Sequence, residues 1–177
     1  MRVIGGEFRS RLLKTPPGLA TRPTPDRLRE SLFNILSPRI EGAVFVDAYA
    51  GCGAVGIEAL SRGAAQAVFI ERARAAVGVI RANLASLGVE ARSQVIQGSA
   101  MLHLAGVDAD IVFIDPPYEL EQEYERSLRA LGDSRALVVV QHAKRFALPE
   151  TVGGLVRTRQ VRQGDNCLSF YGTKALR

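Results

Sequence analysis

A glycine-rich stretch at residues 47–56, DAYAGCGAVG, combines residue types and spacing that suggest a ligand site. Its glycines at 51, 53 and 56 follow the G-x-G-x-x-G pattern, which lets a backbone turn approach a nucleotide at the start of a helix. Glu71 stands twenty residues after Gly51, where an acidic side chain can accept hydrogen bonds from both ribose hydroxyls. These residues predict a cofactor with an adenosine at one end, and both NAD and S-adenosylmethionine fit that description.

Two further features favour S-adenosylmethionine over NAD. Asp47 directly precedes the glycine loop, where its carboxylate would oppose a pyrophosphate but attract the ammonium and sulfonium groups of S-adenosylmethionine. Residues 115–118 read DPPY and end another apolar run, so both motifs are expected to face one crevice at the carboxyl ends of the strands. Alone, the Asp could be a cap and DPPY a tight turn. Together, on successive strand ends, they favour methyl transfer.

The DPPY motif suits methyl transfer to an exocyclic amine. A side-chain oxygen of Asp115 and the main-chain carbonyl of Pro116 can accept the two N–H hydrogens while the nitrogen becomes tetrahedral. Pro117 stiffens the loop because its φ is fixed, and Tyr118 offers an aromatic face to an unstacked base. We therefore expect these four residues to form the catalytic site, with Asp115 orienting the amine rather than removing its proton.

The apolar runs that surround these motifs predict an α/β fold. Continuous Val- and Ile-rich runs alternate with helical patterns, which is typical of a mostly parallel sheet buried on both faces. The last two runs flank a turn at residues 164–166 and predict an antiparallel hairpin at the C-terminal edge of the sheet. Strands are predicted at 43–48, 67–71, 93–98, 109–115, 136–142, 155–164 and 167–174, and helices at 54–63, 72–88 and within 120–132.

Ahead of this core, residues 1–14 suggest a short β-hairpin or extended arm, and four prolines make residues 15–25 irregular. A helix is predicted over 25–37, with Thr24 as its N-cap, Pro25 at its first position and Pro38 ending it. We expect a single methyltransferase domain over residues 1–177. It would comprise a basic arm at 1–24, the helix at 25–37 and a Rossmann-like core at 43–177.

The net charge of +5 is concentrated near the N-terminus. Residues 1–39 contain eight basic and three acidic residues, whereas residues 40–177 contain fifteen of each. Such asymmetry indicates a polyanionic partner, although a merely solvated surface is an equally weighted interpretation. Arg22 and Thr24 could alternatively lie against the cofactor. The candidate RNA contacts are Arg9, Arg11, Lys14, Arg22, Arg27 and Arg29.

Three segments, RVIGGEFRSRLLKTP, TRPTPDRLRESLFNIL and DAYAGCGAVGIEALSRGA, resemble the bacterial 16S rRNA guanine-N2 methyltransferases of the RsmD family. The resemblance covers nearly the whole chain. It implies a class I methyltransferase fold that uses S-adenosylmethionine, releases S-adenosylhomocysteine and methylates N2 of one guanine in 16S rRNA. The implied partner is that rRNA or the small ribosomal subunit, with or without bound ribosomal proteins.

The resemblance also implies the cofactor contacts, with two departures from the family pattern. Residue 99 is Ser where such enzymes often place Asp or Asn against the adenine amine, and residue 49 is Tyr where Phe is expected. The extra hydroxyl of Tyr49 needs a partner. The expected contacts are Asp47, Tyr49, Gly51, Gly53, Glu71, Arg72, Ser99 and Ala100.

Other functions stay open at this level. DPPY chemistry alone also fits an amino-methyltransferase with another acceptor, either adenine N6 of DNA or RNA or a glutamine side chain. An NAD oxidoreductase is disfavoured because DPPY would have no use in it, and an RNA-binding module without catalysis would not need a cofactor pocket. The two cysteines form no C-x-x-C pair and there are only two histidines, so no metal site is expected. Without an apolar run of about 18 residues or a signal peptide, we expect a cytoplasmic protein, and a monomer.

Overall fold

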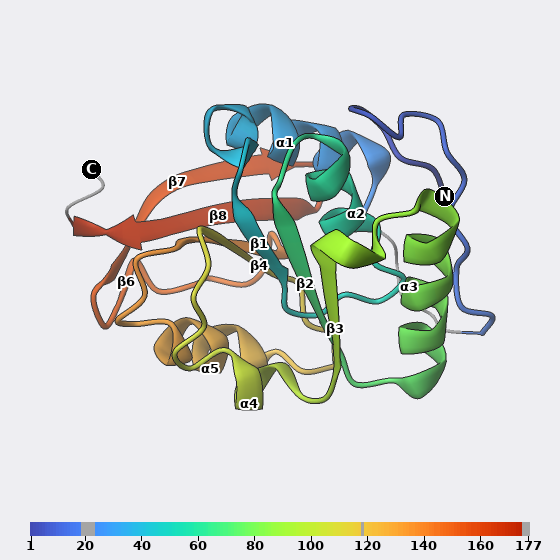
Figure 1. Ribbon diagram of the computed structural model, residues 1–177. Helices are drawn as coiled ribbons and strands as arrows, with labels where there is room; N and C mark the ends of the chain where they lie inside the picture. Colours follow the sequence, from blue (N-terminus) through green and yellow to red (C-terminus); the bar gives the residue numbers. More distant parts are fainter. Residues whose placement is uncertain (19–23, 118, 175–177) are drawn as a thin grey trace.

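The computed structural model describes residues 1–18, 24–117 and 119–174. They contain an eight-stranded sheet in the order β3-β2-β1-β4-β5-β8-β7-β6, with helices packed on both faces (Figure 1). The strands are β1 (Val44–Asp47), β2 (Gln66–Glu71), β3 (Ser93–Gln97), β4 (Ile111–Ile114), β5 (Leu137–Ala143), β6 (Thr151–Val152), β7 (Leu155–Gln163) and β8 (Asn166–Thr173). The helices are α1 (Asp26–Ile40), α2 (Ala54–Ser61), α3 (Arg74–Leu87), the 3-10 turn η1 (Glu90–Arg92), α4 (Ala100–His103) and α5 (Gln122–Ala130).

The sheet has the predicted α/β class. Strands β1 to β5 are parallel, and β8 pairs antiparallel with both β5 and β7, so β8, β7 and β6 form the antiparallel side of the sheet. The strand order reverses between β1 and β4, so the chain crosses over there and leaves a crevice at their carboxyl ends. The sequence did not indicate three short elements, β6, η1 and α4, because pieces of two to four residues carry no periodic signal.

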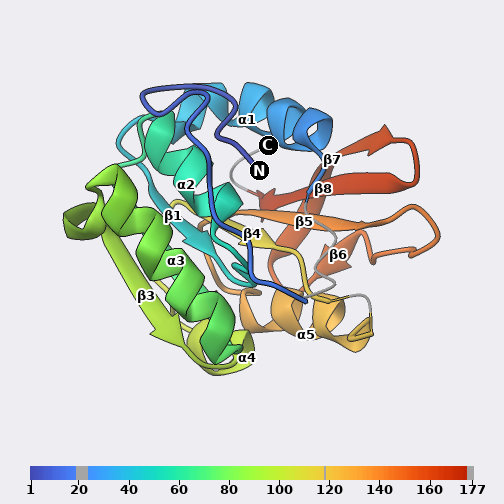
Figure 2. The ribbon, with the colours of Figure 1, turned by 90° about the vertical axis from the view of Figure 1, so that its right-hand side faces the viewer.

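The helices divide into two layers (Figures 1 and 2). Helices α1, α2 and α3 cover one face of the sheet, where Leu32 of α1 and Phe45 of β1 belong to one buried cluster. Helices α4 and α5 cover the opposite face, where Leu128 of α5 packs in a cluster with Val46 and Val140. Because consecutive residues of a buried strand serve opposite layers, the strands need uninterrupted apolar runs.

The N-terminal arm, residues 1–14, packs against the first layer as part of the folded body. Its backbone doubles back, with Val3 N–H donating to the Arg11 carbonyl at 3.0 Å and Leu13 N–H to the Met1 carbonyl at 2.9 Å. This is the predicted hairpin, but its regular pairing is limited to one β-bridge, between Arg2 and Leu12. Val3, Phe8 and Leu13 are buried with side chains of α2 and α3.

Polar contacts with Glu58, Ser61 and Asn83 hold the arm in place. The carboxylate of Glu58, buried in α2, accepts the N–H groups of Ile4 and Gly5, each at 2.9 Å. On α3, the Asn83 side chain accepts the Lys14 N–H at 2.8 Å and donates to the Lys14 carbonyl at 3.0 Å. The arm therefore follows a fixed path beside α2 and α3 (Figure 2).

Helix α1 differs from its predicted boundaries at both ends. Pro25, not Thr24, occupies the N-cap position, and the Thr24 hydroxyl instead donates to Oε1 of Gln141 at 3.1 Å. The helix continues past Pro38 to Ile40. Pro38 lies in the last turn, where its missing N–H removes only one helical hydrogen bond, and Ile40 is buried in the core.

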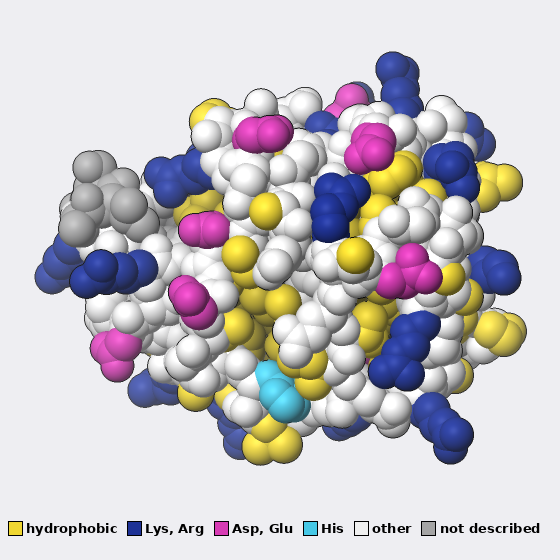
Figure 3. All heavy atoms as spheres, viewed as in Figure 1, with side chains coloured by type: hydrophobic (Ala, Val, Ile, Leu, Met, Phe, Trp, Pro, Cys, Tyr) yellow, Lys and Arg dark blue, Asp and Glu magenta, His cyan; other side chains and the backbone are white. Residues whose placement is uncertain are grey.

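The described surface carries charges of both signs. Figure 3 shows basic and acidic side chains interspersed over one face, with Lys and Arg side chains along its right-hand side, over α3 and the N-terminal arm. None of the helices within residues 1–18, 24–117 and 119–174 is long and apolar enough to span a membrane.

Candidate active site

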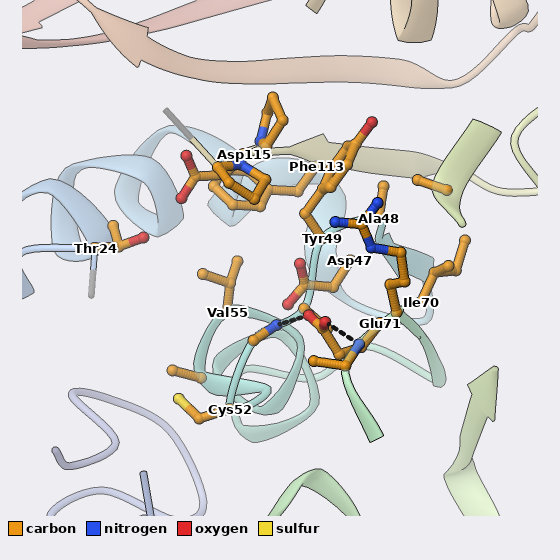
Figure 4. Close-up of a pocket in the computed structure, with 18 of the residues that line it drawn as sticks. Thr24, Asp47, Ala48, Tyr49, Cys52, Val55, Ile70, Glu71, Phe113 and Asp115 are labelled. Carbon is orange, nitrogen blue, oxygen red and sulfur yellow. Dashed lines mark hydrogen bonds between the residues drawn. The ribbon is translucent and has the colours of Figure 1, made fainter. Parts of the chain in front are cut away.

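The carboxyl ends of the parallel strands open onto a pocket of about 460 Å³ at the β1–β4 crossover. Three strands contribute an acidic residue at or just beyond their ends, Asp47 from β1, Glu71 from β2 and Asp115 after β4, and β5 contributes Gln141, two residues before its end. The two sequence motifs, separated by about sixty residues, therefore face one cavity, as predicted. Figure 4 shows Asp47, Glu71 and Asp115 around this cavity.

Asp47 is the deepest of these acidic residues, with 2% of its surface exposed. Its Oδ2 accepts the N–H of Gly56 at 3.1 Å, inside the first turn of α2. Burial raises the pKa of Asp47 to about 7, with a further contribution from the nearby Glu71 charge, although the Gly56 N–H opposes the shift. A cation placed beside Asp47 would restore its ionised form.

Glu71 joins the end of β2 to the glycine loop. One carboxylate oxygen accepts the Gly51 N–H and the other accepts the Ala73 N–H, both at 2.8 Å (dashed lines, Figure 4). Each oxygen keeps a second lone pair that can accept a ligand hydroxyl. Glu71 thus orders the loop and still presents acceptors to the pocket.

The three glycines of the fingerprint have different roles. Gly51 and Gly53 adopt φ values of 58° and 86°, in the left-handed region that other residues rarely occupy. They turn the chain from β1 into α2, whose N-cap is Gly53. Gly56 instead permits helix packing, since an added Cβ would lie 2.3 Å from Cε1 of Phe69. Of the three, Gly51 lines the pocket, whereas Gly53, a predicted cofactor contact, does not, because a Cβ at this position would face Ile80 and Phe69 at 3.4 Å.

The other predicted cofactor contacts also reach the pocket. Ser99 and Ala100 approach it at the start of α4, and the exposed Arg72 approaches it just beyond β2. The Tyr49 hydroxyl, the departure noted above, finds its partner in Ser127 Oγ of α5 at 3.0 Å. Ser99 makes no side-chain cap to α4, so its hydroxyl is free of that role. Contact of each residue with a cofactor stays a prediction.

Asp115 faces the pocket without a partner. Within the described part of the chain its carboxylate accepts no hydrogen bond, and burial together with the Asp47 charge raises its pKa to about 8. Pro116 and Pro117 line the same wall. The fourth residue of the motif, Tyr118, lies outside the described residues, as does Arg22.

Several pocket residues were not predicted from the sequence. Met1, Thr15 and Pro16 come from the N-terminal segment, which the fold brings over the cofactor loop. Glu119 and Glu123 follow DPPY in an acidic run that none of the sequence motifs includes. Gln141 did carry a signal, because it is a polar residue that follows the buried Val138–Val140 run in β5.

The predicted RNA-contacting residues separate into two groups. Arg9, Arg11, Lys14 and Arg27 are exposed, and Arg11 also donates to the Ser86 carbonyl at 3.0 Å. The prediction for Arg29 is wrong, because this side chain is completely buried between α1 and α2. Its position, four residues before Phe33 on the apolar stripe of α1, faces inward.

The buried Arg29 charge is compensated inside the fold. Its Nη2 donates to the Arg2 carbonyl at 2.7 Å and to Asp26 at 3.2 Å, and its Nε lies 3.9 Å from the Glu58 carboxylate. Since Glu58 also holds the N-terminal arm, Arg29 belongs to the structural anchor of that arm. It is not available to a nucleic acid.

The charge of the pocket indicates what it can hold. Its described lining includes five acidic side chains, from Asp47, Glu71, Asp115, Glu119 and Glu123, against a single cationic side chain, that of Arg72. Such a lining would repel a pyrophosphate and attract a ligand with positive groups. The residues present therefore fit S-adenosylmethionine better than NAD.

Comparison with known proteins identifies the family. A family model described as "Conserved hypothetical protein 95" matches residues 1–172. Ribosomal RNA small subunit methyltransferase D of Escherichia coli is 41% identical over 182 residues, which cover 99% of this chain and 91% of that protein.

Solved structures agree with this relationship. The fold matches that of the Escherichia coli protein yhhF, assigned as a methyltransferase, with a TM-score of 0.86, 38% identity, and 99% and 98% of the two chains covered. An RNA methyltransferase of Salinibacter ruber, solved with S-adenosyl-L-homocysteine, matches with a TM-score of 0.65 and 21% identity over 85% of this chain and 92% of that one. The chain thus belongs to the conserved hypothetical protein 95 family, the RsmD family of methyltransferases.

Proposed function

We propose that this protein transfers a methyl group from S-adenosylmethionine to the exocyclic N2 amine of a guanine in 16S rRNA of the small ribosomal subunit. The observation that carries the proposal is the unpartnered carboxylate of Asp115, which faces the same pocket as the Asp47 and Glu71 carboxylates. The name of the Escherichia coli relative supports the rRNA substrate. The complex of the Salinibacter ruber neighbour, a match in fold, is consistent with the proposed cofactor.

The residues around the glycine loop would hold the cofactor. Asp47 is positioned for the cationic amino acid end, and Glu71 for the ribose hydroxyls. The N–H groups at the start of α2 and the half-buried Ser99 complete the described wall. When bound, S-adenosylmethionine supplies an electrophilic methyl group on a positively charged sulfur.

Asp115 and Pro116 would orient the amine that is methylated. In guanine the N2 lone pair is delocalised into the ring, so the amine must be turned to present it. The Asp115 carboxylate and the Pro116 carbonyl provide acceptors for its two hydrogens, and holding them directs the lone pair into the pocket. Such positioning can contribute roughly 7–11 kcal/mol to lowering a reaction barrier. After transfer the nitrogen is strongly acidic, so the proton can leave without a strong base.

The test is nucleoside mass spectrometry after incubation with methyl-labelled S-adenosylmethionine. The substrates are small ribosomal subunits, and 16S rRNA stripped from them, both lacking this methylation. Labelled N2-methylguanosine supports the proposal, and the better substrate identifies the form that the enzyme recognises. Label in N6-methyladenosine would retain the amine chemistry but refute the guanine assignment. No label in either nucleoside, with cofactor binding demonstrated, would refute the substrate.

Asp115→Ala provides the matched test of the site. We expect turnover to fall on the order of 100-fold or more, while cofactor affinity stays nearly unchanged. Asp108→Ala, a change at an exposed acidic residue in the loop before β4, is the control and should retain full activity. Undiminished turnover in Asp115→Ala would refute the assigned role of this carboxylate.

A further inference from the structure

Gln141 sits beside Asp115 at the edge of the sheet. Strands β4 and β5 are parallel, with Phe113 beside Val139 and Ile114 beside Val140, so the next residues on the two strands are Asp115 and Gln141. Residues at the same register on neighbouring strands project toward the same face. Both residues line the pocket, and Gln141 is only 5% exposed.

One end of the Gln141 amide is held and the other is free. Its Oε1 accepts the hydroxyl of Thr24 at 3.1 Å, just before α1 begins. Its Nε2 donates to nothing within the described part of the chain. Gln141 lines the pocket, and its Nε2 is not one of the buried unpaired atoms of the described chain, so this N–H₂ group is accessible to a ligand there and can donate to it.

The Gln141 amide nitrogen does not take part in the hydrogen bonds that order the cofactor loop. Asp47 and Glu71 are already connected to backbone N–H groups of the glycine loop and of the chain after β2. Figure 4 shows Thr24 on the side of the pocket toward which the Asp115 carboxylate extends, away from Glu71. Gln141 is hydrogen-bonded to Thr24, so it lies at the same end of the pocket as the Asp115 carboxylate.

At that end the protein presents a hydrogen-bond acceptor beside a donor. The free carboxylate of Asp115 can accept an amine hydrogen, and the Gln141 amide can donate to a lone pair next to that amine. Guanine has this arrangement, because ring nitrogen N3 carries a lone pair and adjoins the carbon that bears the N2 amine.

We propose that Gln141, held by Thr24, donates a hydrogen bond from its Nε2 to N3 of the acceptor guanine while Asp115 accepts from the N2 amine. The inference rests on the proposed guanine-N2 function and adds a residue that selects and positions the base. Thr24 is a positioning residue that acts through Gln141, since its hydroxyl occupies Oε1 and leaves the amide nitrogen facing the pocket.

The first experiment compares three variants on the subunit or rRNA form that the wild-type enzyme methylates. Gln141→Leu removes the amide, and Gln141→Glu replaces the donor with an acceptor. The control, Gln66→Glu, makes the same chemical change at an exposed position at the start of β2. We expect both Gln141 variants to lower kcat/KM for the substrate by about 10- to 100-fold. Gln141→Leu, which introduces no charge, should keep the cofactor affinity and melting temperature of wild type.

The second experiment identifies the contacted atom. The target guanosine is replaced by 3-deazaguanosine, which lacks the N3 lone pair, in the same substrate form. Wild type and Gln141→Leu are assayed on both substrates. We expect the loss of kcat/KM caused by Gln141→Leu and the loss caused by 3-deazaguanosine to be non-additive. Gln141→Leu should therefore methylate the two substrates at nearly the same kcat/KM. Thr24→Val should lower kcat/KM in the wild-type background and have little further effect in Gln141→Leu.

The outcomes separate this inference from the proposed function. Wild-type enzyme that forms no N2-methylguanosine refutes the function itself. If wild-type enzyme forms N2-methylguanosine, either of two results refutes the contact between Gln141 and N3 and leaves the function intact. One is full activity of the Gln141 variants, and the other is an additive loss of kcat/KM on 3-deazaguanosine.

Discussion

Replacing Asp47 with Asn should stabilise the free protein and weaken its ligand binding. The pKa of Asp47 is raised from 3.8 to about 7 by burial at 2% exposure. The folded state therefore binds more protons than the unfolded state between these two values, and the Asp47 contribution to stability falls as pH rises through that range. Above pH 7 the folded protein bears the full cost of a buried carboxylate without a cationic partner.

The size of this cost follows from the pKa. Each tenfold change in the ionisation constant corresponds to 1.36 kcal/mol, so the change from 3.8 to about 7 corresponds to about 4 kcal/mol. Asn cannot ionise, and its side-chain carbonyl can still accept the Gly56 N–H. The stability gain of Asp47→Asn should grow from near zero at about pH 4 to about 4 kcal/mol at about pH 8.

Urea unfolding of wild type and Asp47→Asn at several pH values between 4 and 8 measures this difference. Asp108→Asn, which removes an exposed carboxylate, is the control and should show no such pH-dependent gain. A gain that is the same at every pH would show that ionisation of Asp47 is not its cause. A variant less stable than wild type at pH 8 would refute the reasoning altogether.

Three further predictions concern the ligands and the glycine loop. Affinity for S-adenosylmethionine should fall about tenfold from pH 9 to pH 6, as Asp47 gains a proton with a pKa of about 7; isothermal titration calorimetry measures it, and a constant affinity would contradict the electrostatic role of this carboxylate. Gly56→Ala should lower the free energy of unfolding by about 1–3 kcal/mol because its Cβ meets Phe69, whereas Gly78→Ala, in open space on α3, should not; equal unfolding energies would count against the packing role. Replacing three exposed cations of the arm with Gln should flatten the logarithmic salt dependence of RNA binding by about 2, and an unchanged slope would make them an ordinary solvated surface. The three are Arg9, Arg11 and Lys14.

The separation of roles within the N-terminal charge was not readable from the sequence. Arg27 and Arg29 are two residues apart, and both look like surface cations of an amphipathic helix. Packing of α1 on α2 leaves Arg27 exposed and buries Arg29 beside Glu58. Only the tertiary structure supplies that partner, because Glu58 lies on a helix that starts after β1.

The sequence did predict which acidic side chains gather at the strand ends. Asp47, Glu71 and Asp115 each follow a buried apolar run, and parallel strands bring such residues to one edge by their geometry alone. The left-handed turns at Gly51 and Gly53 agree with the glycine pattern of this loop, because few other residues adopt them. These features are local or periodic, and the amino-acid sequence determines them without long-range information.

The tertiary structure decided what surrounds that edge. It brought Met1, Thr15 and Pro16 over the cofactor loop by anchoring the arm to Glu58 and Asn83. It also places Thr24 within hydrogen-bond distance of Gln141, 117 positions away in the chain. That hydrogen bond occupies the Gln141 oxygen and leaves the amide nitrogen free beside Asp115. Contacts between such distant residues depend on how the layers pack, and no local pattern encodes them.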